Sequence, residues 1–446
     1  MIRKVHDTVN YFRTHWFVRQ AAVLQFGTTF ANILQALIGI FIARLLEPER
    51  YGIYAIAMSL ASLLSIILAS GFQEATVSLL SRGYTRNDKD EIKDILGFYA
   101  KLISYSIIIT ICALILAPLI SNYFYHDAQI GFYAALVVAA ALISSTLFSI
   151  TIASLQVSGE ISLMSALNVI DQVVRWGLSL LLVYLGYGIW GAMAGHFFGA
   201  MIMFGLSFFI WKIFLKRHSI FPSLYKIIAF IPRAPFKKYF GFSFWIAVDR
   251  NVAMLYFILP VLIAGAYIAT TEVGYFKLAF GYLNIAMTIL VPVSLLLNVS
   301  FPKMRIEEKD NLRKNFIKVS LYSTLVSTAV TAGIILIAPI FFRVLYGVDY
   351  LPSVPYVRAF AVYGALFGIG VGLGPMWRAL NKVKVSILIN AITLAIGIPL
   401  GIFLLREFGG WGAVAMVTLL VTISHLISFI YLSNSLKSIP DELVKE

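Results

Sequence analysis

Charged side chains are scarce in this sequence. Asp, Glu, Lys and Arg make up 13% of its 446 residues, and 60% of the residues are hydrophobic. Soluble domains carry about 25% charged and about 45–50% apolar residues. The apolar residues here form charge-free stretches of about 20 residues, the length that crosses a hydrocarbon core about 30 Å thick. The scarcity of charge excludes an ordinary soluble protein and predicts an all-α integral membrane protein.

Several kinds of reactive site are absent as well. The single cysteine, Cys112, lies in an apolar run, which excludes an intramolecular disulfide and a cysteine-based metal site. The sequence has no GxxxxGK[ST] phosphate loop and no H-E-x-x-H pair. We therefore expect no ATP hydrolysis by this chain, no metal and no cofactor. The connections on one face are all short, which argues against a membrane glycosyltransferase or polymerase and favours a transporter over an enzyme.

Twelve apolar segments are long enough to span a membrane. The predicted spans cover residues 20–45, 51–79, 97–122, 130–156, 161–186, 189–214, 239–267, 274–299, 317–343, 355–377, 384–405 and 410–434. Lys and Arg gather in alternate connections, and such residues mark the cytoplasmic face. This pattern predicts a multi-pass protein of the cell (inner or plasma) membrane with both termini in the cytoplasm. It also explains the net charge of +14 without nucleic acid as a partner.

The ends and the middle of the chain carry further signals. The basic, amphipathic lead-in Met1–Arg19 predicts that the first span is an uncleaved anchor. The longest hydrophilic connection contains prolines beside its basic residues. It predicts an N-terminal six-helix bundle over 1–214, a basic Pro-containing cytoplasmic linker over 215–238, and a C-terminal six-helix bundle over 239–446.

The two predicted halves share an internal repeat. Three matches agree on an offset of 221 or 222 residues: Tyr51-Gly52 with Val273-Gly274, Trp190 with Trp411, and Asn168 with Asn390. Because six spans return the chain to its starting side, the repeat is parallel, with its axis along the membrane normal. Two such bundles around a central cavity are typical of a transporter.

Basic and amide side chains inside the spans are candidates for substrate binding, because each intramembrane charge costs about 2.5–3.5 kcal/mol. The candidates are Arg250, Arg175, Arg358, Asn32, Gln25 and Gln35. Guanidinium groups suit phosphate, so the arginines favour an anionic substrate. The amides form a stripe along one face of span one. The alternative to substrate binding is that they form hydrogen bonds between helices. Arg358 alternatively snorkels to the interface.

Three carboxylates, Asp249, Asp171 and Glu74, are candidates for proton or sodium coupling. Asp171 and Arg175 are four residues apart, so the alternative is that they neutralise each other. Asp249 and Arg250 are adjacent and point about 100° apart on a helix, so they cannot line one wall together. Glu74 lies near a helix end and alternatively reaches the interface.

A glycine-rich segment interrupts the tenth span. Gly368, Gly370, Gly372 and Gly374 alternate with apolar residues before Pro375. The spacing and the absence of a preceding strand argue against a dinucleotide site. Because Gly and Pro both weaken the helical hydrogen-bond ladder, the segment predicts a kinked helix that serves either packing or a functional hinge.

Several segments together resemble the polysaccharide transporter family, the Wzx-type oligosaccharide flippases of the multidrug/oligosaccharidyl-lipid/polysaccharide exporter superfamily. The run from Ala43 to Tyr54 resembles the signature "arlLgpeeyGlya" between the first two helices of that family. Further similar segments are Glu272–Phe276, Asp249-Arg250, Phe301-Pro302 and Tyr346–Tyr350, in the family's order. The twelve predicted spans differ from the fourteen of typical lipid II flippases, which argues against a peptidoglycan precursor.

The resemblance implies a flippase that moves polyprenyl-(pyro)phosphate-linked oligosaccharide from the cytoplasmic to the outer leaflet by alternating access. Its cavity arginines would hold the phosphate, and glycan polymerases or glycosyltransferases would be its protein partners. Two other functions stay open from the sequence. An ion-coupled small-molecule or drug antiporter of the same fold would need an acidic cavity. A non-transporting membrane scaffold would depend on its basic loops instead.

Overall fold

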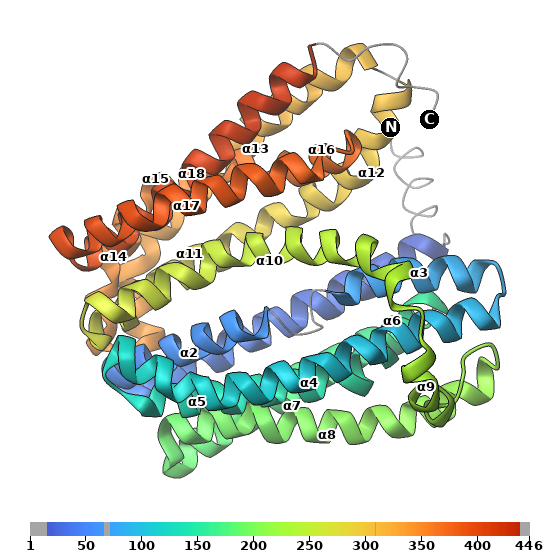
Figure 1. Ribbon diagram of the computed structural model, residues 1–446. Coiled ribbons are helices and arrows are strands. Elements are labelled where there is room, and N and C mark those ends of the chain that lie inside the picture. The colour runs from blue at the N-terminus through green and yellow to red at the C-terminus, as the bar shows by residue number, and fades with distance from the viewer. Residues whose placement is uncertain (1–15, 67–71, 308, 438–446) are drawn as a thin grey trace, which may run out of the picture. The chain divides into compact units, whose positions relative to one another are not determined.

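The computed structural model describes residues 16–66, 72–307 and 309–437, and every regular element in these ranges is a helix (Figure 1). The α-helices are α2 (Trp16–Ser65), α3 (Gln73–Thr85), α4 (Lys89–Tyr125), α5 (Ala128–Ile143), α6 (Ser149–Val157), α7 (Ile161–Leu182), α8 (Gly188–Arg217), α9 (Leu224–Phe230), α10 (Phe236–Tyr267), α11 (Thr270–Met287), α12 (Val291–Glu307), α13 (Lys309–Phe341), α14 (Ser353–Ala359), α15 (Ala361–Leu366), α16 (Leu373–Ala379), α17 (Val383–Phe408) and α18 (Gly410–Ser435). The predicted all-helical fold is confirmed.

The helices are long and apolar enough for a multi-pass membrane protein. In the described ranges nine helical stretches meet the length and composition of a membrane span, or ten if a bent pair (Val348–Ala359 with Ala361–Ala379) forms one span. Two of the nine contain a break, at Glu47 and at Gly186, that divides each into two predicted spans. All twelve predicted spans therefore coincide with helix, except that residues 67–71 of the second lie outside the described ranges. The predicted lead-in Met1–Arg19 also lies largely outside them.

Helix α2 changes direction at Glu47, where the backbone leaves the helical region with φ 63° and ψ 165°. The next residue is Pro48. A proline ring disfavours helical geometry in the residue before it, so the sequence places the break where the first two predicted spans are joined. The helical structure resumes directly after this break.

The chain folds into two compact units, which we describe separately. Unit 1 consists of residues 1–46 and 60–247, and unit 2 of residues 47–59 and 248–446. Both α2 and α10 therefore contribute to both units. The predicted division at the linker 215–238 stays a prediction.

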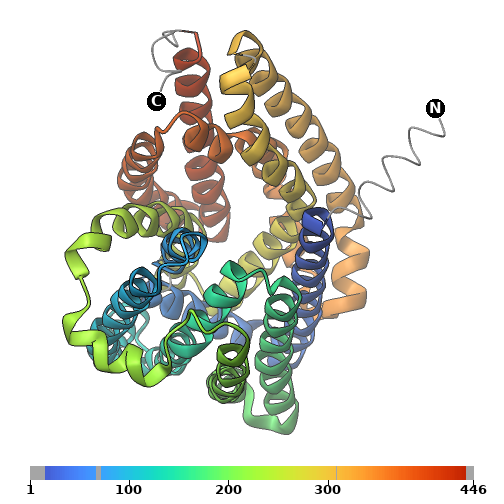
Figure 2. The ribbon, with the colours of Figure 1, turned by 90° about the vertical axis from the view of Figure 1, so that its right-hand side faces the viewer.

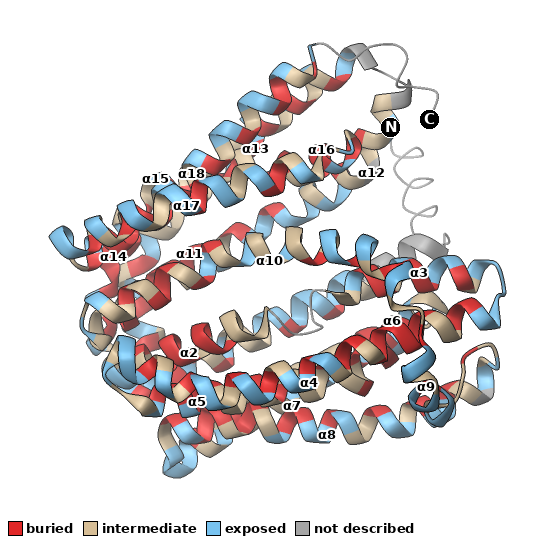
Figure 3. Cartoon of the chain, viewed as in Figure 1, coloured by how far each residue is buried: buried red, intermediate tan, exposed pale blue. Residues whose placement is uncertain are grey.

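In unit 1 the helices α4, α5, α7 and α8 pack along one another (Figure 1). Together with α6 they form an apolar core that includes Phe98 of α4, Leu155 of α6 and Trp211 of α8, all almost fully buried. Large apolar side chains such as Ile115 and Phe209 are 64% exposed on the outside. Figure 3 shows these exposed residues recurring along α4 and α8. Such a surface suits lipid, because lipid solvates apolar side chains that water would not.

The predicted linker 215–238 is folded onto the end of α4. Ile227 of the short helix α9 is buried in the core of unit 1. Lys101 donates to the carbonyl oxygen of Pro232 at 3.1 Å, and Lys238 forms an ion pair with Asp94 at 3.7 Å. The linker is therefore an ordered part of unit 1.

In unit 2 the two glycines matched by the sequence repeat lie against each other. A Cβ atom on Gly52 would lie 3.2 Å from the backbone nitrogen of Gly274, and a Cβ on Gly274 would lie 3.4 Å from that of Gly52. Only glycine allows two helix backbones to approach so closely. The repeat match thus corresponds to a close contact between the residue 47–59 segment of α2 and α11.

The remaining helices of unit 2 are held at one end by basic side chains. Helices α17 and α18 pack along each other (Figure 2). Arg305 donates to the carbonyl oxygen of Ala379 at 2.6 Å, and Arg313 to that of Ser433 at 3.1 Å. The last carbonyl groups of a helix lack partners within it and carry partial negative charge. The basic residues therefore cap the ends of α16 and α18.

Candidate functional site

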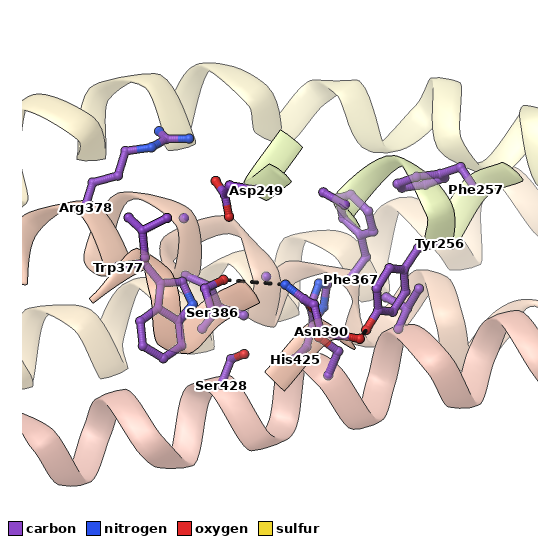
Figure 4. A pocket seen from close by; sticks show the side chains of 17 residues that line it. Asp249, Tyr256, Phe257, Phe367, Trp377, Arg378, Ser386, Asn390, His425 and Ser428 are labelled. Carbon is purple, nitrogen blue, oxygen red and sulfur yellow. Dashed lines mark hydrogen bonds between the residues drawn. The ribbon is translucent and has the colours of Figure 1, made fainter. Parts of the chain in front are cut away.

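Unit 2 encloses a cavity of about 280 Å³ among α10, the 3₁₀ segment Phe367–Gly372, α16, α17 and α18 (Figure 4). The residues that carry its polar chemistry are Asp249, Tyr256, Arg378, Ser386, Asn390, Ser424, His425 and Ser428. Apolar side chains, among them Phe257, Phe367 and Trp377, complete the wall. A mostly apolar cavity with a few convergent polar groups is the usual form of a binding site.

Asn390 is the centre of the hydrogen bonding in this cavity. Ser424 of α18 donates to its side-chain oxygen at 2.6 Å. The Tyr256 hydroxyl of α10 donates to its main-chain carbonyl oxygen at 3.1 Å. Its own amide nitrogen lies 3.5 Å from the Ser386 hydroxyl, one turn earlier in α17. Asn390 therefore ties α10, α17 and α18 together and fixes the polar side of the cavity.

Asp249 and Arg250 take different positions on α10. Asp249 is half-buried and lines the cavity, whereas Arg250 is exposed and is not part of the lining. Adjacent residues on a helix point about 100° apart, so the two charges face different surroundings. Among the sequence candidates, Asp249 is the one that the structure brings to this cavity.

The glycine-rich segment forms part of the cavity wall. It is a 3₁₀ stretch, Phe367–Gly372, that interrupts the α-helical path between α15 and α16. The 52° bend of this path lies earlier, between Ala359 and Ala361, so the kink predicted at the glycines stays a prediction. A Cβ on Gly370 would lie 2.7 Å from Nε2 of His425, so the glycine makes room for the imidazole. The Gly368 amide donates to the Ser327 hydroxyl at 3.1 Å. The glycines therefore allow α13 and α18 to pack closely around this segment.

Replacing Ser424 with alanine tests the role of Asn390. We expect Ser424→Ala to reduce the free energy of unfolding by about 0.5–1.5 kcal/mol, the usual net contribution of such a hydrogen bond. Unfolding of the purified protein by titration with SDS measures it. Ser300→Ala is the matched control, because Ser300 donates only to the Leu296 carbonyl of its own helix. Equal effects of the two variants would contradict the role of Asn390 as a link between helices.

Asp171 and Arg175 form an ion pair in unit 1. The Arg175 Nε lies 2.5 Å from the Asp171 carboxylate, and the two side chains are 16% and 12% exposed. The arginine stem packs against Gly199 of α8, where a Cβ would lie 2.7 Å from it. Of the two roles open from the sequence, mutual neutralisation is the one that this geometry favours. Substrate binding by Arg175 and ion coupling by Asp171 stay predictions.

The other candidates of unit 1 are dispersed. Gln25 and Asn32 are exposed on α2, and Gln35 is half-buried. Gln25 donates to Thr29 of its own helix at 3.2 Å. Glu74 is exposed in the first turn of α3. Within unit 1 the structure does not gather these residues into one site.

In unit 2, Arg358 is exposed in the last turn of α14 and is not part of the cavity lining. Among the residues that the structure describes, no group of three or more His, Cys, Asp or Glu side chains is placed to hold a metal ion.

Lys277 and His425 were not among the residues predicted from the sequence. Lys277 lies in α11, inside the eighth predicted span, and the visible signal was a charged residue in an apolar segment. His425 lies in α18 and lines the cavity. Its signal was weaker, because a single histidine in an apolar helix has no distinctive spacing.

Comparison with known proteins gives the family and the fold. A family described as "Polysaccharide biosynthesis protein" matches residues 41–355. A curated relative from Klebsiella pneumoniae, an "Uncharacterized membrane protein in cps region", is 25% identical over 199 residues. That alignment covers 44% of this chain and 40% of the relative, so less than half the length of the relative is matched.

Two solved structures resemble this chain over nearly its whole length. An inward-facing multidrug resistance MATE family transporter of the MOP superfamily has a TM-score of 0.71 at 15% identity, with 91% of this chain and 95% of that chain covered. The lipid II flippase MurJ in its inward closed conformation has a TM-score of 0.69 at 16% identity, with 94% and 88% covered. Identities this low establish the fold alone. Because the family match covers more than half of the sequence, the chain belongs to the family of polysaccharide biosynthesis proteins and has the fold of MATE transporters and MurJ.

Proposed function

We propose that this protein is a flippase that moves polyprenyl-(pyro)phosphate-linked oligosaccharide from the cytoplasmic to the outer leaflet for surface polysaccharide or glycan assembly. The observation that carries the proposal is a polysaccharide biosynthesis family on a transporter fold. A sugar polymer assembled outside the cell from lipid-linked units needs a protein that carries those units across the bilayer.

The position of Arg250 supports an anionic substrate. Its guanidinium is exposed on α10, next in sequence to the cavity residue Asp249. A guanidinium offers several donors in a plane and pairs with two phosphate oxygens at once. In this mechanism Arg250 binds the lipid phosphate while the polyprenyl tail stays in the bilayer.

Alternating access requires a substrate or an ion that binds one conformation more tightly than the other. Asp249 is the candidate for such an ion, a proton or sodium, because its cavity also presents the oxygen atoms of Asn390, Ser386 and Ser424. Carboxylate, hydroxyl and carbonyl oxygens are suitable ligands for hard cations. Coupling at Asp249 would link ion binding to the helices that Asn390 joins.

Flipping in proteoliposomes tests the proposal. A short-chain polyprenyl-pyrophosphate sugar is placed on one side, and its appearance on the other side is measured with and without proton and sodium gradients. We expect Arg250→Ala to reduce the flipping rate at least about tenfold, because a charged hydrogen bond contributes about 1.5–3 kcal/mol. The control is Arg406→Ala, because the Arg406 guanidinium lies over the Tyr267 ring, 5.1 Å from the ring centroid. It should flip at the wild-type rate.

Two results would overturn the proposal. Wild-type protein that moves no lipid under any gradient would favour a scaffold. Wild-type protein that exchanges small cations for protons or sodium, is inactivated by Asp249→Asn and tolerates Arg250→Ala would favour the antiporter.

A further inference from the structure

A cation that has no partner among the described residues lies inside unit 2. Lys277 stands two turns into α11, within the helical stretch Thr270–Arg305 that is apolar enough to span a membrane. Its side chain is half-buried. It forms no ion pair or hydrogen bond with any residue that the structure describes. An ammonium group in a membrane span is costly unless an anion or a polar group compensates it. We therefore expect a ligand to bind at Lys277.

The face of α11 that carries Lys277 has free space next to this residue. One turn earlier, Gly274 is in close contact with the Pro48–Gly52 segment of α2. One turn later, Gly281 has no atom within 4 Å of where a Cβ would stand. On one flank of Lys277, the rings of Phe276 and Phe280 pack against Phe360. Lys277 therefore lies between a tight contact and an open space, where a ligand atom has room.

The position of Lys277 relative to Arg250 follows from one ring contact. Phe257 of α10 stacks on Phe280 of α11 with ring centroids 5.9 Å apart, and the two helices are joined by the short turn after Tyr267. Arg250 lies seven residues before Phe257, and Lys277 three residues before Phe280, in antiparallel helices. At a rise of 1.5 Å per residue, the two cations are about 15 Å apart along the helix direction.

We propose that Lys277 is a second binding residue for the phosphate of the lipid-linked substrate, nearer than Arg250 to the turn between α10 and α11. The inference rests on the proposed function and adds a step to it. An ammonium binds phosphate as a point charge, whereas a guanidinium binds it with two parallel hydrogen bonds. The substrate anion would therefore pass from Arg250, which binds it with two hydrogen bonds, to Lys277, from which it dissociates more easily.

Equilibrium binding tests this assignment independently of transport. Geranylgeranyl pyrophosphate is titrated into the purified protein in detergent at low salt, and binding is followed by tryptophan fluorescence. We expect Lys277→Gln to raise the dissociation constant about tenfold, and Lys277→Arg to stay within about threefold of wild type. Geranylgeraniol, which lacks the phosphates, should bind wild type and Lys277→Gln equally. Because Lys277 has no described partner, neither variant should unfold more easily than wild type.

Restoring the charge chemically provides the second measurement. In a Cys112→Ala background, Lys277→Cys is treated with 2-aminoethyl methanethiosulfonate, which forms a disulfide and regenerates a primary ammonium at this position. We expect the treatment to recover most of the lost affinity, and methyl methanethiosulfonate, which adds no charge, to recover none.

The outcomes separate this inference from the proposed function. Wild-type flipping together with unchanged pyrophosphate affinity in Lys277→Gln would overturn the role of Lys277 and leave the flippase intact. Equal recovery by the charged and the neutral reagent would also overturn it, because side-chain volume rather than charge would then matter. Loss of affinity in Lys277→Gln with recovery only by the charged reagent supports it, even in a protein that fails to flip.

Discussion

Arg175→Ala is expected to lower the free energy of unfolding by about 3–5 kcal/mol, the cost of removing one partner of a buried ion pair. The substitution leaves the Asp171 carboxylate, 12% exposed, without the guanidinium 2.5 Å away. It also removes the arginine stem that packs against Gly199 of α8. SDS titration followed by circular dichroism measures the loss, and purified yield in detergent should fall with it.

The double variant Asp171→Asn/Arg175→Gln tests whether the ion pair has a structural role only or also a role in transport. It removes both charges but keeps polar side chains of similar length, so we expect it to recover most of the stability lost in Arg175→Ala. If the pair only neutralises itself, the double variant also keeps flipping activity. A double variant as stable as wild type that no longer flips lipid would instead return Arg175 or Asp171 to the functional site. Full stability of Arg175→Ala would show that the pair is not structural.

Gly52→Leu is expected to destabilise unit 2 by about 3 kcal/mol or more, at the upper end of the cost of overpacking. A Cβ on Gly52 would lie 2.6 Å from the carbonyl carbon of Thr270 and 3.2 Å from the Gly274 nitrogen. Both are backbone atoms, so no side chain can rotate away and the helices must separate. Thermal unfolding of the purified protein in detergent measures the effect.

Gly39→Ala is the matched control for this variant. Gly39 lies in the same helix, and nothing is within 4 Å of where its Cβ would stand. Alanine at an open helical position should raise stability by about 0.5–1 kcal/mol, because it restricts the unfolded chain. Similar losses in Gly52→Leu and Gly39→Ala would show that α2 tolerates no side chain generally, and would remove the special role of the Gly52–Gly274 contact.

The fold could be predicted largely because a bilayer constrains it. Every backbone polar group in lipid must be bonded within its own helix or barrel, so charge-free stretches such as 130–156 could only be helices. The break at Glu47 followed from Pro48 and the 3₁₀ stretch Phe367–Gly372 from the glycines. Local chemistry determined these features.

The cavity was harder to predict because it brings α10 against α17 and α18, more than 100 residues later in the sequence. Asn390 stood out only as half of a repeat match, and nothing near it in the sequence indicated Tyr256 or Ser424 as its partners. The Asp171–Arg175 pair was predictable, since a spacing of four residues brings two side chains together on one helix. Lys277 was recognisable as an intramembrane charge, but its open surroundings depend on Gly281 and on the packing of α11.

The segment 47–59 of α2 belongs to unit 2, although the rest of that unit begins only at Val248. A ribosome therefore makes the glycine surface around Gly52 222 residues before its partner Gly274. At about 5–20 residues per second, this delay lasts on the order of 10–40 s. During this time the nascent helix presents its small-residue face to lipid, so the early chain is open to wrong helix partners before its own α11 has been synthesised.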